Sequence, residues 1–297
     1  MDTGSSSFEV GGFECISVRD GALNYPPESF FSNAPLERVE EALHERDLPT
    51  AQIMTPYTCL FVDTGEHRVL VDTGAGDFLG AHVAEIFPGL DHSTSVTGLL
   101  LENLRAAGIE PSDIDTVVIT HAHPDHVGGT LDEAGRLVFG EARYFISRDE
   151  WNFWTSDAAT AKASAVMVDT ARLNLEPLES RLTLIEDASE VVPGVQAIAT
   201  PGHTPGHIAL SIASEDERLL HVSDAVLYPL HLERPEWTPV FDILPEQASA
   251  SKRRIFDRAA EEEALVFAHH FPPFPNLGYD RKQEQGWRWQ PIDTQGS

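Results

Sequence analysis

Three histidines and one aspartate lie within six residues of each other, in the segment Thr120-His121-Ala122-His123-Pro124-Asp125-His126-Val127-Gly128-Gly129. Imidazole nitrogens and carboxylate oxygens are donors that zinc and similar ions bind in proteins. An apolar run over 115–120 precedes the motif, as a buried strand would. Residues two apart on a strand share a face, so His121 and His123 are expected to point the same way. Asp125 and His126 then belong to a turn that can reach a second ion. The pattern predicts a metal site rather than a solvated loop.

Three later segments place further histidines and aspartates where strands are expected to end. His203 lies in the Gly/Pro turn Thr200-Pro-Gly-His203-Thr-Pro-Gly-His207. Asp224 ends the run Leu219-Leu-His-Val-Ser-Asp224, and His269 and His270 follow Leu265-Val-Phe-Ala. A lone histidine or aspartate at a strand end is more often a hydrogen-bonded core or cap residue. Their joint occurrence behind the first motif favours metal ligands.

In chain order, the motifs H-x-H-x-D-H, T-P-G-H-T-x-G-H, S-D and a last histidine before Pro-Phe-Pro resemble the metallo-β-lactamase superfamily. The resemblance runs from Val69-Leu-Val-Asp72-Thr-Gly74 to Pro275. It implies an α/β fold of the αββα type, in which two facing mixed β-sheets are flanked by helices. It also implies two divalent metal ions. Zinc is the first candidate, and manganese, iron and cobalt suit the same donors.

The family pattern implies a role for each matching residue. His121, His123 and His203 would hold one ion, Asp125, His126 and His270 the other, and Asp224 would bridge the two. His269 is the alternative to His270, because an extra proline blurs the register of the motif that follows. Adjacent strand residues point to opposite faces, so only one of the two is expected to be a ligand. Asp72 would not bind metal itself but would orient the site through hydrogen bonds near the ligands.

The chemistry that the resemblance implies is hydrolysis of an ester-like bond by a metal-bound hydroxide. Coordination brings the pKa of water from about 15.7 down to about 7. Asp125 is the expected catalytic residue, because it is placed to accept a proton. The substrate is expected to be a small molecule: a lactone, carboxylic ester or phosphotriester of apolar character.

Three segments resemble the branch of acyl-homoserine-lactone lactonases and organophosphate (methyl parathion) hydrolases. They are Phe13-Glu-Cys-Ile-Ser-Val-Arg-Asp-Gly21, Arg148-Asp-Glu-Trp-Asn-Phe-Trp154 and Gly286-Trp-Arg-Trp289. Lactonases of that branch place a tyrosine three residues after the bridging aspartate, where this chain has Leu227, followed by Tyr228. This departure weakens the lactonase assignment but not the hydrolase one. The aromatic residues expected either to line an apolar pocket or to belong to the core are Phe30, Phe31, Trp151, Trp154 and Tyr228.

Other functions fit less well. Many class B β-lactamases carry a cysteine ligand where this chain has Asp224, and oxygen-reducing diiron relatives carry glutamate where it has His123. Asp63 and Asp72 begin Asp-Thr-Gly motifs but lie too close in sequence for an aspartic protease. Two alternatives stay open. A glyoxalase II-like thioesterase would need basic side chains near the C-terminus to hold its anionic substrate, and Arg281-Lys282 is a weak candidate for this role. A non-catalytic metal-binding member is disfavoured because structural zinc sites usually close with four ligands.

The elements that position these residues follow from hydrophobic periodicity and turn residues. Strands are expected over 8–19, 58–62, 68–71, 115–120, 182–186, 195–200, 208–213, 219–223 and 265–269. Helices are expected over 36–46, 94–108, 158–175 and 245–262, with another beginning near 148. No linker or repeat divides the chain. It is therefore interpreted as one domain over 1–297, with an N-terminal strand and substrate or dimer segment (1–60), a metal-binding core (61–275) and a C-terminal tail (276–297).

The composition limits the binding partners and the cellular environment that the protein is expected to have. The 297 residues carry a net charge of −28 and only three lysines, and so acidic a surface argues against nucleic-acid binding. The same composition resembles haloarchaeal proteins and suits a salt-rich cytoplasm, because screening lengths fall to about 3 Å at 1 M salt. Two cysteines exclude a disulfide framework. No apolar run reaches membrane-span length and no export signal is visible at the start, so an unexported protein without membrane contact is expected. Relatives often dimerise through the N-terminal segment, which implies a homodimer.

Overall fold

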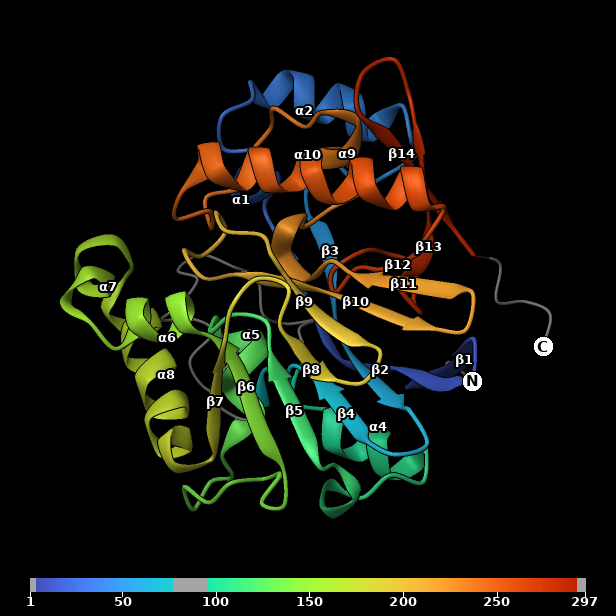
Figure 1. Cartoon of the computed structure of the whole chain (residues 1–297). Helices are drawn as coiled ribbons and strands as arrows, with labels where there is room; N and C mark the ends of the chain where they lie inside the picture. Colours follow the sequence, from blue (N-terminus) through green and yellow to red (C-terminus); the bar gives the residue numbers. More distant parts are fainter. Residues whose placement is uncertain (1–3, 77–95, 293–297) are drawn as a thin grey trace.

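The computed structural model describes residues 4–76 and 96–292, whose strands form two seven-stranded sheets (Figure 1). The first sheet holds, in spatial order, β1 (Ser5–Val10), β2 (Phe13–Tyr25), β3 (Ile53–Asp63), β4 (Arg68–Val71), β5 (Thr116–Ile119), β6 (Arg143–Ser147) and β7 (Leu182–Ile185). The second holds β14 (Trp287–Pro291), β13 (Leu277–Lys282), β12 (Leu265–Phe267), β11 (Glu217–His221), β10 (Ile208–Ser214), β9 (Val195–Ala199) and β8 (Glu190–Val192).

Both sheets are mixed. Strands β1 to β4 pair antiparallel and β4 to β7 pair parallel, whereas in the second sheet β11 and β12 pair parallel. Parallel neighbours need crossover connections, which is why helices lie between them in sequence. Those of the first sheet are α4 (Leu100–Ala106), α5 (Pro124–Val127), α6 (Arg148–Trp154), α7 (Asp157–Lys162) and α8 (Ala165–Leu175).

The core has one inner and two outer layers, as the αββα prediction requires. Aliphatic side chains from both sheets meet between them, among them Val62 and Val71 from the first and Leu210 and Ile212 from the second. Outside the first sheet, one hydrophobic cluster includes residues of α4, α6 and α8. Outside the second, α10 (Pro245–Glu262) buries its apolar side against the sheet (Figure 1). The predicted fold class is confirmed.

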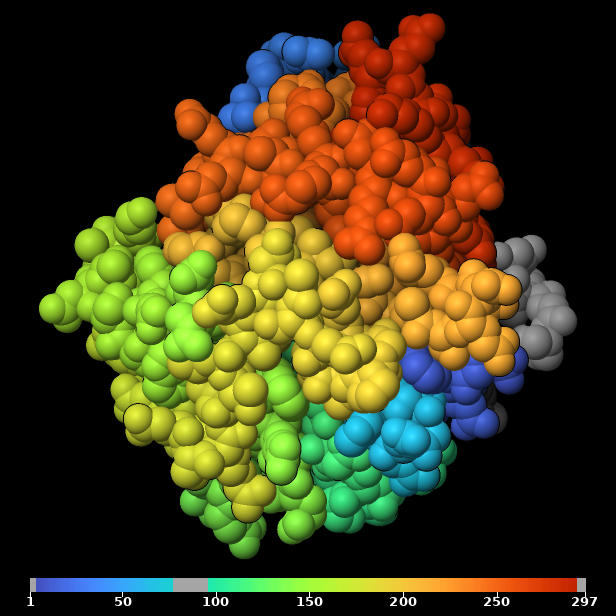
Figure 2. Space-filling model, viewed as in Figure 1, coloured from blue at the N-terminus to red at the C-terminus, as the bar shows by residue number. Residues whose placement is uncertain are grey.

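The chain between β2 and β3 lies beside a segment about two hundred residues later. It contains α1 (Pro27–Phe30) and α2 (Leu36–His44), and it contacts α9 (Leu230–Glu233) and the loop after it (Figures 1 and 2). The Asn33 amide donates to the Glu236 carbonyl at 2.8 Å and its oxygen accepts the Thr238 N–H at 2.9 Å. Arg46 forms an ion pair with Glu233. These two segments together cover one end of the sandwich.

Two predicted helices differ from the structure. The helix expected over 158–175 is broken into α7 and α8, because Ala163 and Ser164 are extended. The helix expected from Thr94 begins at Leu100; Thr94 itself lies outside the described residues. Val96 pairs with Ala22 instead, and the Asp20 carboxylate accepts the Leu100 N–H at 3.0 Å. At the start of α4, tertiary pairing overrides local helix preference.

No helix in the described part of the chain is both long and apolar enough to cross a bilayer. Cys15 and Cys59 are both free and buried, as the cysteine count predicts. Burial raises the pKa of the Cys15 thiol to about 12, so it is an inert core residue rather than a nucleophile.

Candidate metal centre

The predicted ligands come from the ends of strands that meet at one edge of the sandwich. His121 and His123 directly follow β5, and Asp125 and His126 lie on the short helix α5 that comes next. His203 lies between β9 and β10. The remaining residues follow β11 and β12, which are parallel neighbours, so their carboxyl ends lie side by side. They are Asp224, His269 and His270.

The first cluster contains His121, His123, His203 and Asp224, all buried. Their candidate ligand atoms all lie within 4.8 Å of one another. The His203 Nε2 atom is 3.2 Å from Asp224 Oδ2 and 2.8 Å from His123 Nδ1. The His121 Nε2 atom is 3.7 Å from the same Asp224 oxygen. Three imidazole nitrogens and one carboxylate oxygen therefore converge on a space the size of one coordination shell.

The second cluster contains Asp125, His126, His269 and His270, again with ligand atoms within 4.8 Å. The His270 Nε2 atom is 3.3 Å from Asp125 Oδ2 and 3.4 Å from Asp224 Oδ2. The His126 Nε2 atom is 3.4 Å from Asp224 Oδ1. Asp224 thus stands between the clusters, with oxygens that approach histidines of both.

Among the buried atoms of this space that have no hydrogen-bond partner in the described structure, His126 Nε2 and Asp224 Oδ1 face each other at 3.4 Å. Buried polar atoms of this kind are costly unless something binds them. A cation between them would satisfy both, and the surrounding nitrogen and oxygen donors suit a transition metal. The residues present therefore fit two metal ions.

His269 and His270 both lie in the second cluster. The expectation that they face opposite sides of a strand is wrong, because β12 ends at Phe267, before either residue. The two differ in their surroundings. The His270 Nδ1–H donates to the Pro56 carbonyl at 2.9 Å, which leaves its Nε2 for the clusters. The His269 ring stacks on the His126 ring, with centroids 4.1 Å apart, and neither of its nitrogens has a hydrogen-bond partner in the described structure.

Asp72 is buried beside the first motif and contacts two of its residues. Its Oδ2 is 2.8 Å from His126 Nδ1, and its Oδ1 accepts the Thr120 N–H at 2.8 Å. The histidine is thereby held with Nε2 toward the clusters. Gly129 allows the Thr73 backbone to approach closely, because a side chain at residue 129 would place a carbon 2.0 Å from the Thr73 carbonyl oxygen. The missing side chain at Gly129 therefore admits the neighbouring loop.

Electrostatics also favour cations in this space. Burial lowers the pKa of His123 to about 3, so its imidazole is neutral and able to ligate. Burial opposes the charged form of His203 too, but hydrogen bonds with Asp224 and Asp242 raise its pKa to about 9. The ion pairs that the described residues make with the buried carboxylates Asp72, Asp224 and Asp242 are all with histidines. Two dications would compensate the same carboxylates while the imidazoles stay neutral and able to ligate.

Comparison with known proteins settles the family. Residues 54–270 match the family model described as the metallo-beta-lactamase superfamily. The chain belongs to the metallo-β-lactamase superfamily. It is 28% identical over 250 residues to an N-acyl homoserine lactonase of Bacillus thuringiensis, which covers 81% of this chain and 87% of that protein.

Two solved structures extend the similarity to the whole chain. One is AidC, a dizinc quorum-quenching lactonase in complex with a product, with a TM-score of 0.87, 26% identity and 99% of each chain covered. The other is the hydrolase AbOPH, with a TM-score of 0.86, 26% identity and the same coverage. This superfamily member is a metal-binding hydrolase. The predictions of family, branch and enzyme class are confirmed.

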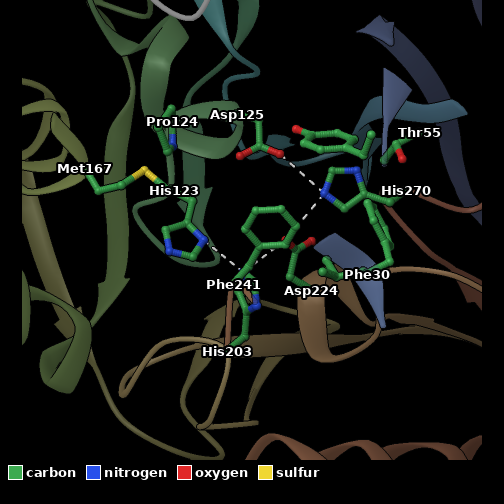
Figure 3. Close-up of a pocket in the computed structure, with 12 residues that line it drawn as sticks. Phe30, Thr55, His123, Pro124, Asp125, Met167, His203, Asp224, Phe241 and His270 are labelled. Atoms are coloured by element: carbon green, nitrogen blue, oxygen red, sulfur yellow. Dashed lines mark hydrogen bonds and ion pairs between the residues drawn. The ribbon is translucent and has the colours of Figure 1, made fainter. Parts of the chain in front are cut away.

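A cavity opens directly onto the two clusters (Figure 3). His123, His203 and His270 point into it together with the carboxylates of Asp125 and Asp224. The rest of its wall is formed by Tyr25, Phe30, Thr55, Pro124, Met167, Leu227 and Phe241. Most of this wall is apolar, and it combines the β2–β3 region with the segment after β11.

Of the five aromatic residues expected at the pocket, Phe30 lines this cavity. The other four lie behind its wall. Tyr228 packs edge-on against Phe30 and Phe31, and the rings of Phe30 and Phe31 are tilted against each other. Trp151 and Trp154 belong to the core around the first sheet. Their positions agree with ordinary core packing, which was the second alternative for these aromatic residues.

Several functional residues had escaped the sequence analysis. Glu150 is fully buried, and one oxygen accepts the Ala122 N–H at 2.9 Å and the Trp154 indole N–H at 2.6 Å. The other accepts the Thr204 hydroxyl at 2.6 Å and the Gly206 N–H at 3.0 Å. One carboxylate therefore joins the two loops that carry His123 and His203. Its only signal was its place inside the Arg148–Trp154 motif.

Two further partners fix individual side chains of the first cluster. Asp242 Oδ1 lies 2.9 Å from His203 Nδ1, which leaves Nε2 for the cluster. His207 Nε2 accepts the Asp224 backbone N–H at 3.1 Å and so fixes the turn that carries Asp224. Asp242 lies in a segment without regular periodicity, where no local pattern distinguished it from other surface acids.

Proposed function

We propose that this protein is a dinuclear metal hydrolase of neutral, largely apolar esters, with lactones as the first substrate class and phosphotriesters and carboxylic esters as further ones. The observation that carries the proposal is the position of Asp224. Its Oδ1 faces His126 and its Oδ2 faces His203 and His270, so one carboxylate serves two clusters. His121, His123 and His203 are the proposed ligands of one ion and Asp125, His126 and His270 of the other, with Asp224 as the bridge.

His270 is preferred to His269 as a ligand. Its Nδ1 donates to Pro56, which aims Nε2 at Asp125 and Asp224, as in metal-bound histidines whose second nitrogen donates to a carbonyl. His269 has no such partner in the described structure and is better placed to pack against His126.

Two divalent cations held by these residues would supply Lewis-acid polarisation of the scissile carbonyl or phosphoryl oxygen and would make water more acidic at neutral pH. Asp125 is the residue proposed to move the proton. Its side chain is the most exposed of the proposed ligands, at 16%, and it lines the cavity. Its Oδ2 faces His270, so Oδ1 is the atom proposed to take the proton of the attacking water and pass it to the leaving oxygen.

The cavity wall supports a neutral substrate. No lysine or arginine lines it among the described residues, and residues 77–95 contain neither type in the sequence. An anionic substrate would gain from a fixed cation, as the thiol conjugate of a glyoxalase II-like thioesterase does. Arg281 and Lys282 are exposed on β13, where Lys282 pairs with Asp257. The thioesterase alternative is therefore disfavoured.

Four finer points belong to the same proposal. Zinc is the preferred metal, supported by the dizinc description of AidC, with manganese, iron and cobalt as alternatives. The acidic composition supports a salt-rich cytoplasm. The homodimer through residues 1–60 stays a prediction, which sedimentation analysis can check. So does the organisation of residues 1–297 as one domain.

The experiment compares zinc-loaded and chelated protein on hexanoyl-homoserine lactone, an aryl hexanoate, a dialkyl aryl phosphate, a thioester and a β-lactam, at 0.1 M and 2 M KCl. We expect two metal ions per chain by elemental analysis, and turnover of the first three substrates that chelation abolishes. Two bound ions without turnover of any substrate would instead identify a non-catalytic metal-binding protein. Full stability and activity at 0.1 M KCl would contradict the adaptation to salt.

A further inference from the structure

The cavity contains few polar groups besides the proposed metal ligands. Among its described lining residues outside that set, only Tyr25 and Thr55 carry a hydroxyl. The Thr55 hydroxyl turns back to the Ile53 carbonyl of its own strand, at 3.4 Å. Tyr25 is therefore the stronger candidate to donate a hydrogen bond to a bound substrate.

Tyr25 is held by a second tyrosine. Its hydroxyl is hydrogen-bonded to the Tyr57 hydroxyl. Both residues are buried, because only 5% of the surface of Tyr25 and 1% of the surface of Tyr57 is exposed. Tyr57 does not line the cavity and Tyr25 does. With Tyr57 as donor in this bond, Tyr25 gives its own proton to another acceptor, and a substrate oxygen in the cavity can take that place.

The strands keep this pair in register with the metal centre. Tyr25 of β2 is paired with Ile53 of β3, so it shares a sheet face with Ile53, Thr55 and Tyr57. The carbonyl of Pro56, between the last two, accepts the His270 Nδ1–H. The Tyr57 ring also contacts the His270 ring edge-on, with centroids 5.2 Å apart. One stretch of β3 thus positions both a proposed ligand and the tyrosine pair.

We propose that the Tyr25 hydroxyl, positioned by Tyr57, donates a hydrogen bond to the carbonyl or phosphoryl oxygen of the substrate and strengthens this bond as negative charge develops there. This inference rests on the proposed hydrolase function and adds to it a residue outside the metal ligands. No covalent bond to tyrosine forms. The rest of the wall is apolar, so the pocket selects an acyl or alkyl group of low polarity beside one oxygen acceptor.

The test uses Tyr25→Phe, Tyr57→Phe and the double variant, because phenylalanine keeps both rings. Removing one donor to an oxyanion lowers kcat on the order of 10²-fold. We expect that loss for Tyr25→Phe with little change in KM, a smaller loss for Tyr57→Phe, and a double variant no slower than Tyr25→Phe alone. Additive losses would show that Tyr57 does not act through Tyr25 and would overturn the proposal.

Aryl hexanoates with leaving groups of graded acidity identify the oxygen that Tyr25 contacts. A constant Tyr25→Phe loss across the series supports the carbonyl oxygen, whereas a loss that grows with poorer leaving groups contradicts it. Tyr144→Phe is the matched control, because this hydroxyl donates to the Phe139 carbonyl at 3.2 Å in the core away from the cavity. It should leave kcat unchanged.

A binding measurement separates failure of this inference from failure of the proposed function. Calorimetry with zinc-loaded protein and a hexylphosphonate monoester, whose anionic oxygens resemble the developing charge, requires no turnover. Tyr25→Phe should weaken phosphonate binding by about 10-fold or more, as loss of a hydrogen bond to a charged group does. Equal affinity for wild type and Tyr25→Phe would overturn the role of Tyr25 even if the ester substrates are hydrolysed. Weaker phosphonate binding without ester turnover would support the tyrosine donor and refute the proposed ester substrates.

Discussion

The site has two parts in which side chains are held by different interactions. We call the part that carries the ligand clusters the metal floor, and the part that covers the cavity the pocket roof. The metal floor comprises the two ligand clusters with Asp72, Glu150 and Asp242, and hydrogen bonds to buried partners fix many of its side chains. The pocket roof comprises residues 25–57 and 227–241. Around the cavity its side chains pack through edge-on aromatic contacts, such as Tyr25–Phe30 at 5.4 Å and Phe30–Phe241 at 6.0 Å between ring centroids, while hydrogen bonds of Asn33 join its two segments farther out.

This difference predicts that the metal floor determines the reaction and that the pocket roof determines which substrates fit. Hydrogen bonds require particular distances and directions, so the metal floor tolerates few substitutions. Apolar contacts depend mainly on volume, so the pocket roof can be repacked at modest cost. We therefore expect substitutions in the floor to abolish metal binding or stability, and substitutions in the roof to change which substrates fit.

The largest effect is expected for Asp224→Asn, which removes the charge that serves both clusters. Metal content should fall below two ions per chain. Activity should fall on the order of 10³-fold or more, because metal-ion stabilisation is worth several kcal/mol. Elemental analysis and kcat/KM measure these changes. Asp216→Asn, on an exposed turn, is the control and should change neither. Full metal content in Asp224→Asn would contradict its bridging position.

Glu150→Ala tests whether the floor depends on residues that touch no metal. It leaves three donors from two loops and the Trp154 indole N–H of α6 without their acceptor, so we expect the free energy of unfolding to fall by about 4 kcal/mol. Metal affinity should fall about 10- to 100-fold, as for other groups that orient ligands. Urea unfolding of the chelated protein and zinc titration measure the two effects. Exposed Glu179→Ala should cause neither, and a change below about 1 kcal/mol in Glu150→Ala would refute the linking role.

The pH dependence of stability tests whether Lys252 supports the pocket roof. Its buried ammonium donates to the carbonyls of Pro235 and Trp237, and burial lowers its pKa from 10.5 to about 8. Between these values the unfolded chain binds more protons than the folded one, so this residue adds stability as pH rises from 8 to 10.5. The stability of wild type relative to Lys252→Met should increase by up to about 3 kcal/mol over this range. The comparison cancels groups common to both proteins, and a constant difference would contradict the shift.

Phe241→Ala should have the smallest effect and should alter selectivity. Shortening this side chain removes apolar contact from the cavity, so kcat/KM for a hexanoyl ester should fall about 10-fold. An acetyl ester, which does not reach the removed surface, should change little, and metal content should stay at the wild-type value. Val240→Ala is the neighbouring control, because Val240 is 58% exposed. Equal losses for short and long esters would show that the roof does not select chain length.

The sequence determined the parts of this protein that depend on short spacing. His121, His123, Asp125 and His126 are neighbours along the chain, so their approach to one another needed only a strand followed by a turn. The helix expected over 245–262 agrees with α10, because its periodicity and its proline start are local signals. The ordered motifs also identified the superfamily before any contact was known.

Only the tertiary structure decided how His269 and His270 face the site, that Glu150 joins two loops, and that Asp242 orients His203. It also decided which aromatic side chains reach the cavity, where Phe30 does and Trp154 does not. The physical reason is that these relations join segments tens to hundreds of residues apart. A side chain's direction then depends on packing and partners that no local pattern encodes.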